Sequence, residues 1–225
     1  ILKKYLTISL KMVSFKTITR LLKLSISHTL GIFTAILQSS GQIVLLGIFF
    51  GPQIIAYIST CKTLFYFMPI RILENTLLAP SYFEYANSFA RDKIENLKHN
   101  HKRHIMLVLM GLLLFIVGSV ALGPFIYNIW LDNKFDLNNI FMLIIIFDVS
   151  LRILKNTNII LLRSINKFFK VSGLEFALYS IAMSVSYYLL FLGHSYIVHF
   201  MIMLVTTLVI LLLSIYFVTK FYKNL

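Results

Sequence analysis

Long apolar runs constrain the fold of this chain more than any other feature. Six of them follow one another, with only short polar connections between them. About 20 apolar residues in an α-helix, each rising about 1.5 Å, cross the hydrocarbon core of a bilayer. The sequence therefore predicts an all-α, polytopic membrane protein whose six transmembrane helices lie near residues 24–50, 54–80, 104–130, 137–162, 170–193 and 195–219.

The composition also favours a membrane protein over a water-soluble one. Of the 225 residues, 59% are hydrophobic and only 13% are charged, whereas a soluble domain carries about 25% charged residues. The net charge of +13 would suggest a nucleic-acid partner in a soluble protein. Here the cations form short clusters between apolar runs, as the positive-inside bias of membrane proteins places them. We therefore expect no nucleic-acid binding.

The position of these cations predicts the orientation of the chain. Most Lys and Arg residues fall in four segments that six spans place on one side of the membrane: 1–23, 81–103, 163–170 and 220–225. The opposite side holds only Lys134. Because cationic connections stay in the cytoplasm, we predict a basic cytoplasmic segment over 1–23, a transmembrane bundle over 24–219 and a cytoplasmic tail over 220–225.

The first residues bear on what kind of sequence this is. Ile1 is not a translation start, and the cations of residues 1–23 argue against an outside N-terminus left by signal-peptide cleavage. We interpret the sequence as a C-terminal piece of a longer protein or as a truncated product. Cys61 is the only cysteine, which excludes a disulfide framework.

Local signals predict how the spans are joined. Pro69 lies in the second span and should kink it, because proline has no N–H to donate. The connections at 51–53 and 193–195 are short enough to require tight hairpins. Residues 83–101 should form one amphipathic helix that continues from the second span along the cytoplasmic face, because apolar residues recur there at helical steps: Phe83, Ala86, Ala90, Ile94 and Leu97.

Ionisable residues inside the second and fifth predicted spans are candidates for function. Each costs roughly 2.5–3.5 kcal/mol at mid-membrane, so such residues usually face an interior or a watery cavity. The second span holds Lys62, Arg71 and Glu74. Arg71 and Glu74 are neighbours at i, i+3, which suits a neutral structural pair and a functional pair equally well. Glu175, near the start of the fifth span, is expected to snorkel towards water.

The fourth span carries the most suggestive group. Asp148, Arg152 and Lys155 share one helical face near the centre of the bilayer, with a net positive charge. An ion pair needs only two of these residues, so the third needs another partner. We therefore expect this face to bind a ligand; the alternative is an ion pair that only sets the register of the helix.

Other candidate chemistry is weak. His99, His101 and His104 lie close together, but Lys102 and Arg103 among them would repel a metal ion, so we interpret the group as a solvated interfacial cluster. The sequence contains no Ser-His-Asp grouping, phosphate-binding loop or paired carboxylates. We expect no enzyme activity, no cofactor and no metal.

Short motifs near the span ends carry a family resemblance: Gly47-Ile-Phe-Phe-Gly51, Ile55-Ala-Tyr-Ile, Lys62-Thr-Leu, Leu77-Leu-Ala-Pro80, Ala90-Arg-Asp92, Leu122-Gly-Pro124 through Trp130, and Leu161-Leu-Arg-Ser-Ile-Asn-Lys167. In residue type and spacing they resemble the C-terminal half of the polysaccharide-biosynthesis and O-antigen flippases. That family belongs to the multidrug/oligosaccharidyl-lipid/polysaccharide exporter superfamily. The resemblance covers nearly the whole chain.

This resemblance implies one six-helix lobe of a two-lobed transporter, which needs an N-terminal half or a second subunit. It implies transport of an undecaprenyl-diphosphate-linked oligosaccharide across the bacterial cytoplasmic membrane, from the inner to the outer leaflet, for surface polysaccharide synthesis. On this view Arg152 and Lys155 bind the diphosphate, and Asp148 holds Arg152 in place. The wider set of expected substrate contacts is Arg152, Lys155, Arg71 and Lys62, with Asp148 and Glu74 orienting them or coupling an ion.

Three alternatives remain open. A drug/cation antiporter of the same superfamily would use a membrane carboxylate such as Asp148 to couple protons or sodium. A membrane-embedded glycosyltransferase, acyltransferase or polymerase would need His, Asp or Arg on outer loops, and these loops are only a few residues long. The third alternative is a remnant without activity.

Overall fold

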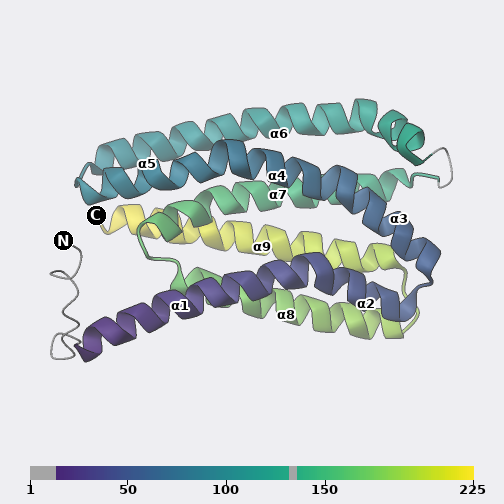
Figure 1. Ribbon diagram of the computed structural model, residues 1–225, viewed down its shortest axis with the longest axis horizontal. Coiled ribbons are helices and arrows are strands. Elements are labelled where there is room, and N and C mark those ends of the chain that lie inside the picture. Colours follow the sequence, from purple (N-terminus) through teal and green to yellow (C-terminus); the bar gives the residue numbers. More distant parts are fainter. Residues whose placement is uncertain (1–13, 132–135) are drawn as a thin grey trace, which may run out of the picture.

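The computed structural model describes residues 14–131 and 136–225, and within these ranges the chain is helical with no β-strand (Figure 1). The prediction of an all-α, polytopic membrane protein is confirmed. The helices form an elongated antiparallel bundle. Their bounds are α1 Phe15–Ile36, α2 Gln42–Phe49, α3 Pro52–Lys62, α4 Met68–Leu73, α5 Ala79–Ala90, α6 Ile94–Leu131, α7 Asn139–Ser164, α8 Phe169–Phe191 and α9 Tyr196–Lys223.

Three short π-helical segments join some of these helices into longer rods. They are η3 (Leu37–Gly41), η4 (Thr63–Phe67) and η5 (Glu74–Leu78). With them, residues 15–49 form one continuous rod and residues 52–90 form another. Together with α6, α7, α8 and α9, this gives six rods within the described residues, one for each predicted span.

The rods differ in whether they are long and apolar enough to cross a membrane. Within the described part of the chain, four helices are long and apolar enough to cross a bilayer: Phe15–Phe49, Ile94–Leu131, Phe169–Phe191 and Tyr196–Lys223. The other two rods, 52–90 and α7, are the ones that carry most of the ionisable residues assigned to spans. The count of six transmembrane helices therefore stays a prediction.

The two predicted tight hairpins are present. Pro52 occupies the first turn of α3, where its missing N–H costs nothing, so the chain reverses directly after Gly51. At the other hairpin, Gly193 adopts φ +87° and α8 ends in a Schellman motif, with the His194 N–H donating to the Leu189 carbonyl at 3.2 Å.

The predicted single helix over 83–101 is wrong. The chain turns between α5 and α6, and the two helices lie side by side as a hairpin (Figure 1). Asp92 adopts the left-handed conformation with φ 54°, and the N–H of Lys93 donates to the Ser88 carbonyl at 2.9 Å. This Schellman motif ends α5 at Ala90, because aspartate tolerates left-handed backbone better than most residues do. Residues 94–101 therefore belong to α6.

The predicted disturbance at Pro69 takes the form of π-helical backbone. η4 and η5 each end two residues before a proline, Pro69 and Pro80 respectively. Each proline removes one N–H donor from the helical ladder, and a local π turn accommodates the interruption. No proline follows the third π segment, η3, in this way; the next one is Pro52, in the first turn of α3.

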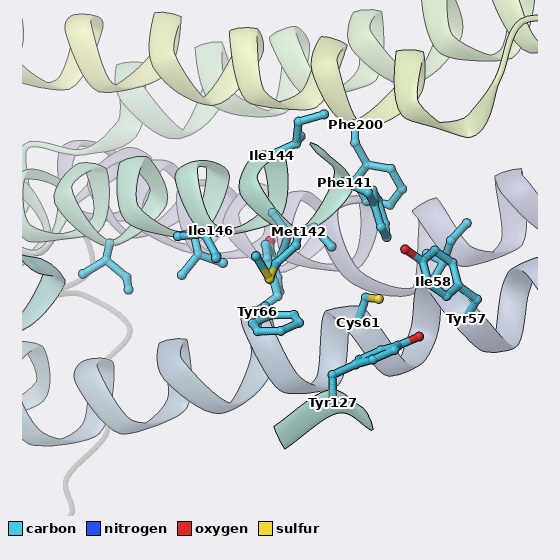
Figure 2. Close-up of a cluster of buried hydrophobic side chains, with 14 of the residues drawn as sticks. Tyr57, Ile58, Cys61, Tyr66, Tyr127, Phe141, Met142, Ile144, Ile146 and Phe200 are labelled. Atoms are coloured by element: carbon cyan, nitrogen blue, oxygen red, sulfur yellow. The ribbon is translucent and has the colours of Figure 1, made fainter. Parts of the chain in front are cut away.

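The core surrounds α7, which packs against α5, α6 and α9. Its largest buried cluster lies towards the end where α2 meets α3 and includes Tyr57, Tyr66, Tyr127 and Phe141 (Figure 2). The Tyr57 hydroxyl accepts a hydrogen bond of 3.0 Å from the backbone N–H of Asn138, at the start of α7. This contact fixes the end of α7 against α3.

Candidate functional site

A polar cavity of about 300 Å³ opens between the first two rods, over α7 and α8. Its wall on the first rod runs from His28 to Gln38, and Glu74 of η5 lines the opposite side. The two rods meet where α2 joins α3 and diverge towards α1 and α5 (Figure 1). The remaining lining residues are mostly charged and come from α7 and α8: Arg152, Lys155, Asn156, Arg163 and Glu175.

Two guanidinium groups on α7 line this cavity without full hydrogen bonding. The Nε atoms of Arg152 and Arg163 are buried and have no hydrogen-bond partner within the described residues. Arg152 lies over the Tyr66 ring, with Cζ 5.1 Å from the ring centroid. Arg163 reaches across to α1, where a Cβ added to Gly31 would lie 3.4 Å from its Nη2. Both groups retain donors for an anion.

Lys155 already has a partner. It forms a buried ion pair with Glu175 of α8, and both side chains are almost fully enclosed. The expectation that Glu175 snorkels to water is therefore wrong, because α8 packs that carboxylate against α7. Lys155 lines the cavity, but its charge is matched inside the protein, which makes it a weaker anion ligand than predicted.

The expected pairing of Arg71 with Glu74 does not occur in the described structure. Glu74 points into the cavity and accepts a hydrogen bond from the Asn156 side-chain amide of α7. Arg71 is exposed and lies outside the cavity lining. The structure thus separates two residues that the i, i+3 spacing appeared to join.

Asp148 is likewise not bonded to Arg152. It accepts a hydrogen bond of 2.6 Å from the Thr207 hydroxyl of α9. Thr207 also shares a hydrogen bond of 2.8 Å with the Tyr179 hydroxyl of α8. The Thr207 hydroxyl also lies 2.9 Å from the Met203 carbonyl of its own helix. Thr207 of α9 therefore links Asp148 of α7 to Tyr179 of α8, and Asp148 does not hold Arg152 by a hydrogen bond as predicted.

Lys62 is enclosed instead of lining the cavity. Its side chain is about 1% exposed, and its ammonium donates to Gln42 Oε1 at 2.7 Å. It also donates to the backbone carbonyls of Gln38 at 3.3 Å and Ser39 at 3.5 Å. The predicted substrate contact by Lys62 is not supported, because its donors are used inside the bundle.

The histidine group is only partly the solvated cluster that the sequence predicted. His99 is exposed at the edge of α6 and His101 is buried, where it shares a hydrogen bond of 3.2 Å with the Tyr222 hydroxyl. His104 shares one of 2.8 Å with the Tyr85 hydroxyl. In the described ranges, no group of three or more His, Cys, Asp or Glu residues is arranged to hold a metal ion.

The cavity combines two free guanidinium groups with one carboxylate, once the Lys155–Glu175 pair is set aside. Arginine meets phosphate through two parallel hydrogen bonds, which suits such a site to a phosphate-bearing ligand. Sequence reasoning missed Arg163, because it placed this residue in a cytoplasmic connection. Its position shows only in the structure, where α7 continues to Ser164 and turns the side chain towards α1.

Comparisons with protein-family models, with curated proteins and with solved structures give no match.

Proposed function

We propose that this chain is one lobe of a flippase that moves a lipid-diphosphate-linked oligosaccharide across the bacterial cytoplasmic membrane. The observation that carries the proposal is the cavity, where Arg152 and Arg163 keep unsatisfied donors within the bundle. A cation is retained in the bilayer interior only when a partner or water offsets its desolvation. A diphosphate supplies several acceptor oxygens for two guanidinium groups. The activity is transport, with no covalent step.

The shape of the bundle is consistent with a missing partner. The cavity opens between the first two rods, above α7 and α8. No other element of the described chain lines it. We propose that a second six-helix half, or a second subunit, covers this side and completes the pathway. The sugar then moves between the two halves, and its lipid tail stays in the membrane.

We propose the orientation in which both ends of the chain face the cytoplasm. The described basic segments gather at one end of the bundle, where α1 starts, α5 turns into α6, α7 turns into α8 and α9 ends (Figure 1). Reporter fusions after Gly51 and Gly193 should report the outside, and fusions at Lys98 and Lys167 the cytoplasm. Reversal at any two of these sites contradicts this orientation.

The antiporter is the second candidate, because Asp148 is a buried membrane carboxylate. The two candidates differ in what the cavity attracts. A flippase needs the cations of the cavity, whereas an antiporter for cationic drugs needs Asp148 and is hindered by those cations.

A binding measurement tests the flippase proposal. The full-length protein, as the cell makes it, is placed in lipid nanodiscs and titrated with undecaprenyl diphosphate. Arg152→Ala and Arg163→Ala should each weaken binding about ten- to hundredfold, the cost of a lost charged hydrogen bond. Arg152→Lys should also weaken binding, because an ammonium cannot form the bidentate contact. Surface-polysaccharide recovery in a flippase-deficient strain should fall in the same order.

The matched control is Arg71→Ala, which removes an exposed arginine outside the cavity. It should bind undecaprenyl diphosphate as the unmodified protein does. Equal losses for Arg71→Ala and Arg152→Ala would show that the cavity is not the binding site. Normal transport by Arg152→Ala and Arg163→Ala at normal protein levels would overturn the proposal.

A further inference from the structure

Lys62 sits in a cage whose parts come from three rods of the bundle. Its acceptors are the Gln38 and Ser39 carbonyls of η3 and the Gln42 side chain of α2. Aromatic rings complete the enclosure, with centroids 5.3–6.0 Å from Nζ: Tyr66, Phe67 and Phe200. Tyr66 and Phe200 belong to the buried cluster of Figure 2.

The chemistry of this cage is that of a site for a monovalent cation. Three oxygens match the three N–H donors of one ammonium, and ring faces attract cations electrostatically. Within the described residues, no carboxylate oxygen lies within ion-pair distance of Nζ. The charge is thus held by dipoles and ring faces, as a bound ion would be, and not by a counter-ion.

The backbone contributes to the cage because η3 is π-helical. In a regular α-helix every carbonyl of the segment accepts from an N–H four residues later, and a π segment interrupts that ladder. Two carbonyls of η3 accept from Lys62. Unlike η4 and η5, this segment is not followed two residues later by a proline, and the Lys62 contacts provide a structural reason for its π-helical form.

We propose that the cage is a cation-binding site that this protein fills permanently with its own Lys62 ammonium. Emptied of that side chain, the cage should bind a small primary ammonium ion. While the Lys62 ammonium occupies the cage, the protein should need no dissociable cation at this site. The proposal goes beyond transport and does not rest on it.

One consequence links the cage to the cavity. The Gln38 backbone carbonyl accepts a hydrogen bond from Lys62 in the cage, and Gln38 also lines the cavity. Occupancy of the cage therefore holds one wall of the cavity in place. Lys62 acts as a positioning residue for that wall.

Chemical rescue tests the proposal. Lys62→Ala removes three methylene groups and the ammonium, which together correspond to propylammonium. The full-length protein is purified in nanodiscs, and its thermal midpoint is measured against propylammonium concentration. Lys62→Ala should unfold several degrees below the unmodified protein. Propylammonium should raise its midpoint, in proportion to the logarithm of concentration once the site is largely filled.

Three controls make the result decisive. The unmodified protein and Lys62→Met, whose cages are filled, should show no shift with propylammonium. Neutral 1-propanol should not stabilise Lys62→Ala, because it lacks the charge. Equal shifts in all variants, or equal stabilisation by propanol, would overturn the proposal.

A variant that unfolds during purification still gives an answer. Lys62→Ala is then purified with propylammonium or with 1-propanol present throughout. Recovery of folded protein only with propylammonium supports the proposal, and recovery with neither overturns it.

Discussion

Two cations approach the Tyr66 ring, and their surroundings differ. Lys62 Nζ is 5.3 Å from the ring centroid and Arg152 Cζ is 5.1 Å from it. Lys62 is enclosed and donates to three oxygens of its own chain, whereas Arg152 borders an open cavity and keeps an unpaired Nε. Two charges that neighbour one aromatic ring thus have different surroundings in this protein. An enclosed charge stabilises the fold, and a charge on the cavity is available to a ligand.

The same contrast applies to the carboxylates. Glu175 is held by Lys155 and Asp148 is held by Thr207, whereas Glu74 points into the cavity. If the distinction is correct, variants of enclosed groups lose stability, and variants of cavity groups mainly lose binding.

The largest loss of stability is expected when an enclosed ion pair is broken. Glu175→Ala leaves Lys155 buried without its carboxylate. The free energy of unfolding should fall by about 3–5 kcal/mol, because the remaining charge is uncompensated. Denaturant unfolding in mixed micelles measures the loss. The double variant Lys155→Met, Glu175→Leu should regain most of it, and a double variant as unstable as Glu175→Ala would contradict the role of the charge.

A smaller loss is expected at the junction of α7, α8 and α9. Thr207→Val removes the hydroxyl that bonds both Asp148 and Tyr179. The loss should be about 1–3 kcal/mol, because buried polar groups are left unsatisfied. The matched control is Thr206→Val, whose hydroxyl bonds only the Ile202 carbonyl of its own helix. Comparable unfolding curves for the two variants would show that this hydrogen-bonded junction contributes nothing.

The smallest change is expected on the cavity. Arg152→Met should alter the free energy of unfolding by less than about 1 kcal/mol, because it removes a donor that already lacks a partner. The unfolding assay used for Glu175→Ala applies here as well. A loss as large as that of Glu175→Ala would break the comparison, since it would make Arg152 a structural cation.

Much of the fold follows from local sequence properties. Apolar runs predict the rods, and Gly51 and Gly193 mark the two tight hairpins. The turn at Asp92 was missed, because the apolar recurrence of residues 83–101 continues through it. Its signal is weak, since aspartate only moderately favours the left-handed backbone that ends α5.

The site depended on contacts between helices, which spacing along one helix does not reveal. Asp148, Arg152 and Lys155 share a face of α7, as predicted, but their partners come from α8 and α9. Glu175 lies near the start of α8, and the sequence of α8 alone does not show that Lys155 of α7 encloses it. The sequence marks Lys62 as an unusual charge within a span. Its cage, however, depends on the backbone of η3, and no residue pattern predicts that this segment is π-helical.

The π segments also change the phase of the two rods that contain them. Successive residues of an α-helix are rotated by roughly 100°, so one inserted residue would turn everything beyond it to another face. A π turn absorbs such a residue locally. Lys62 ends α3 and Glu74 begins η5, so η4 lies between them and sets the rotation of one relative to the other. A single-residue insertion or deletion there re-aims one side chain while the other keeps its neighbours.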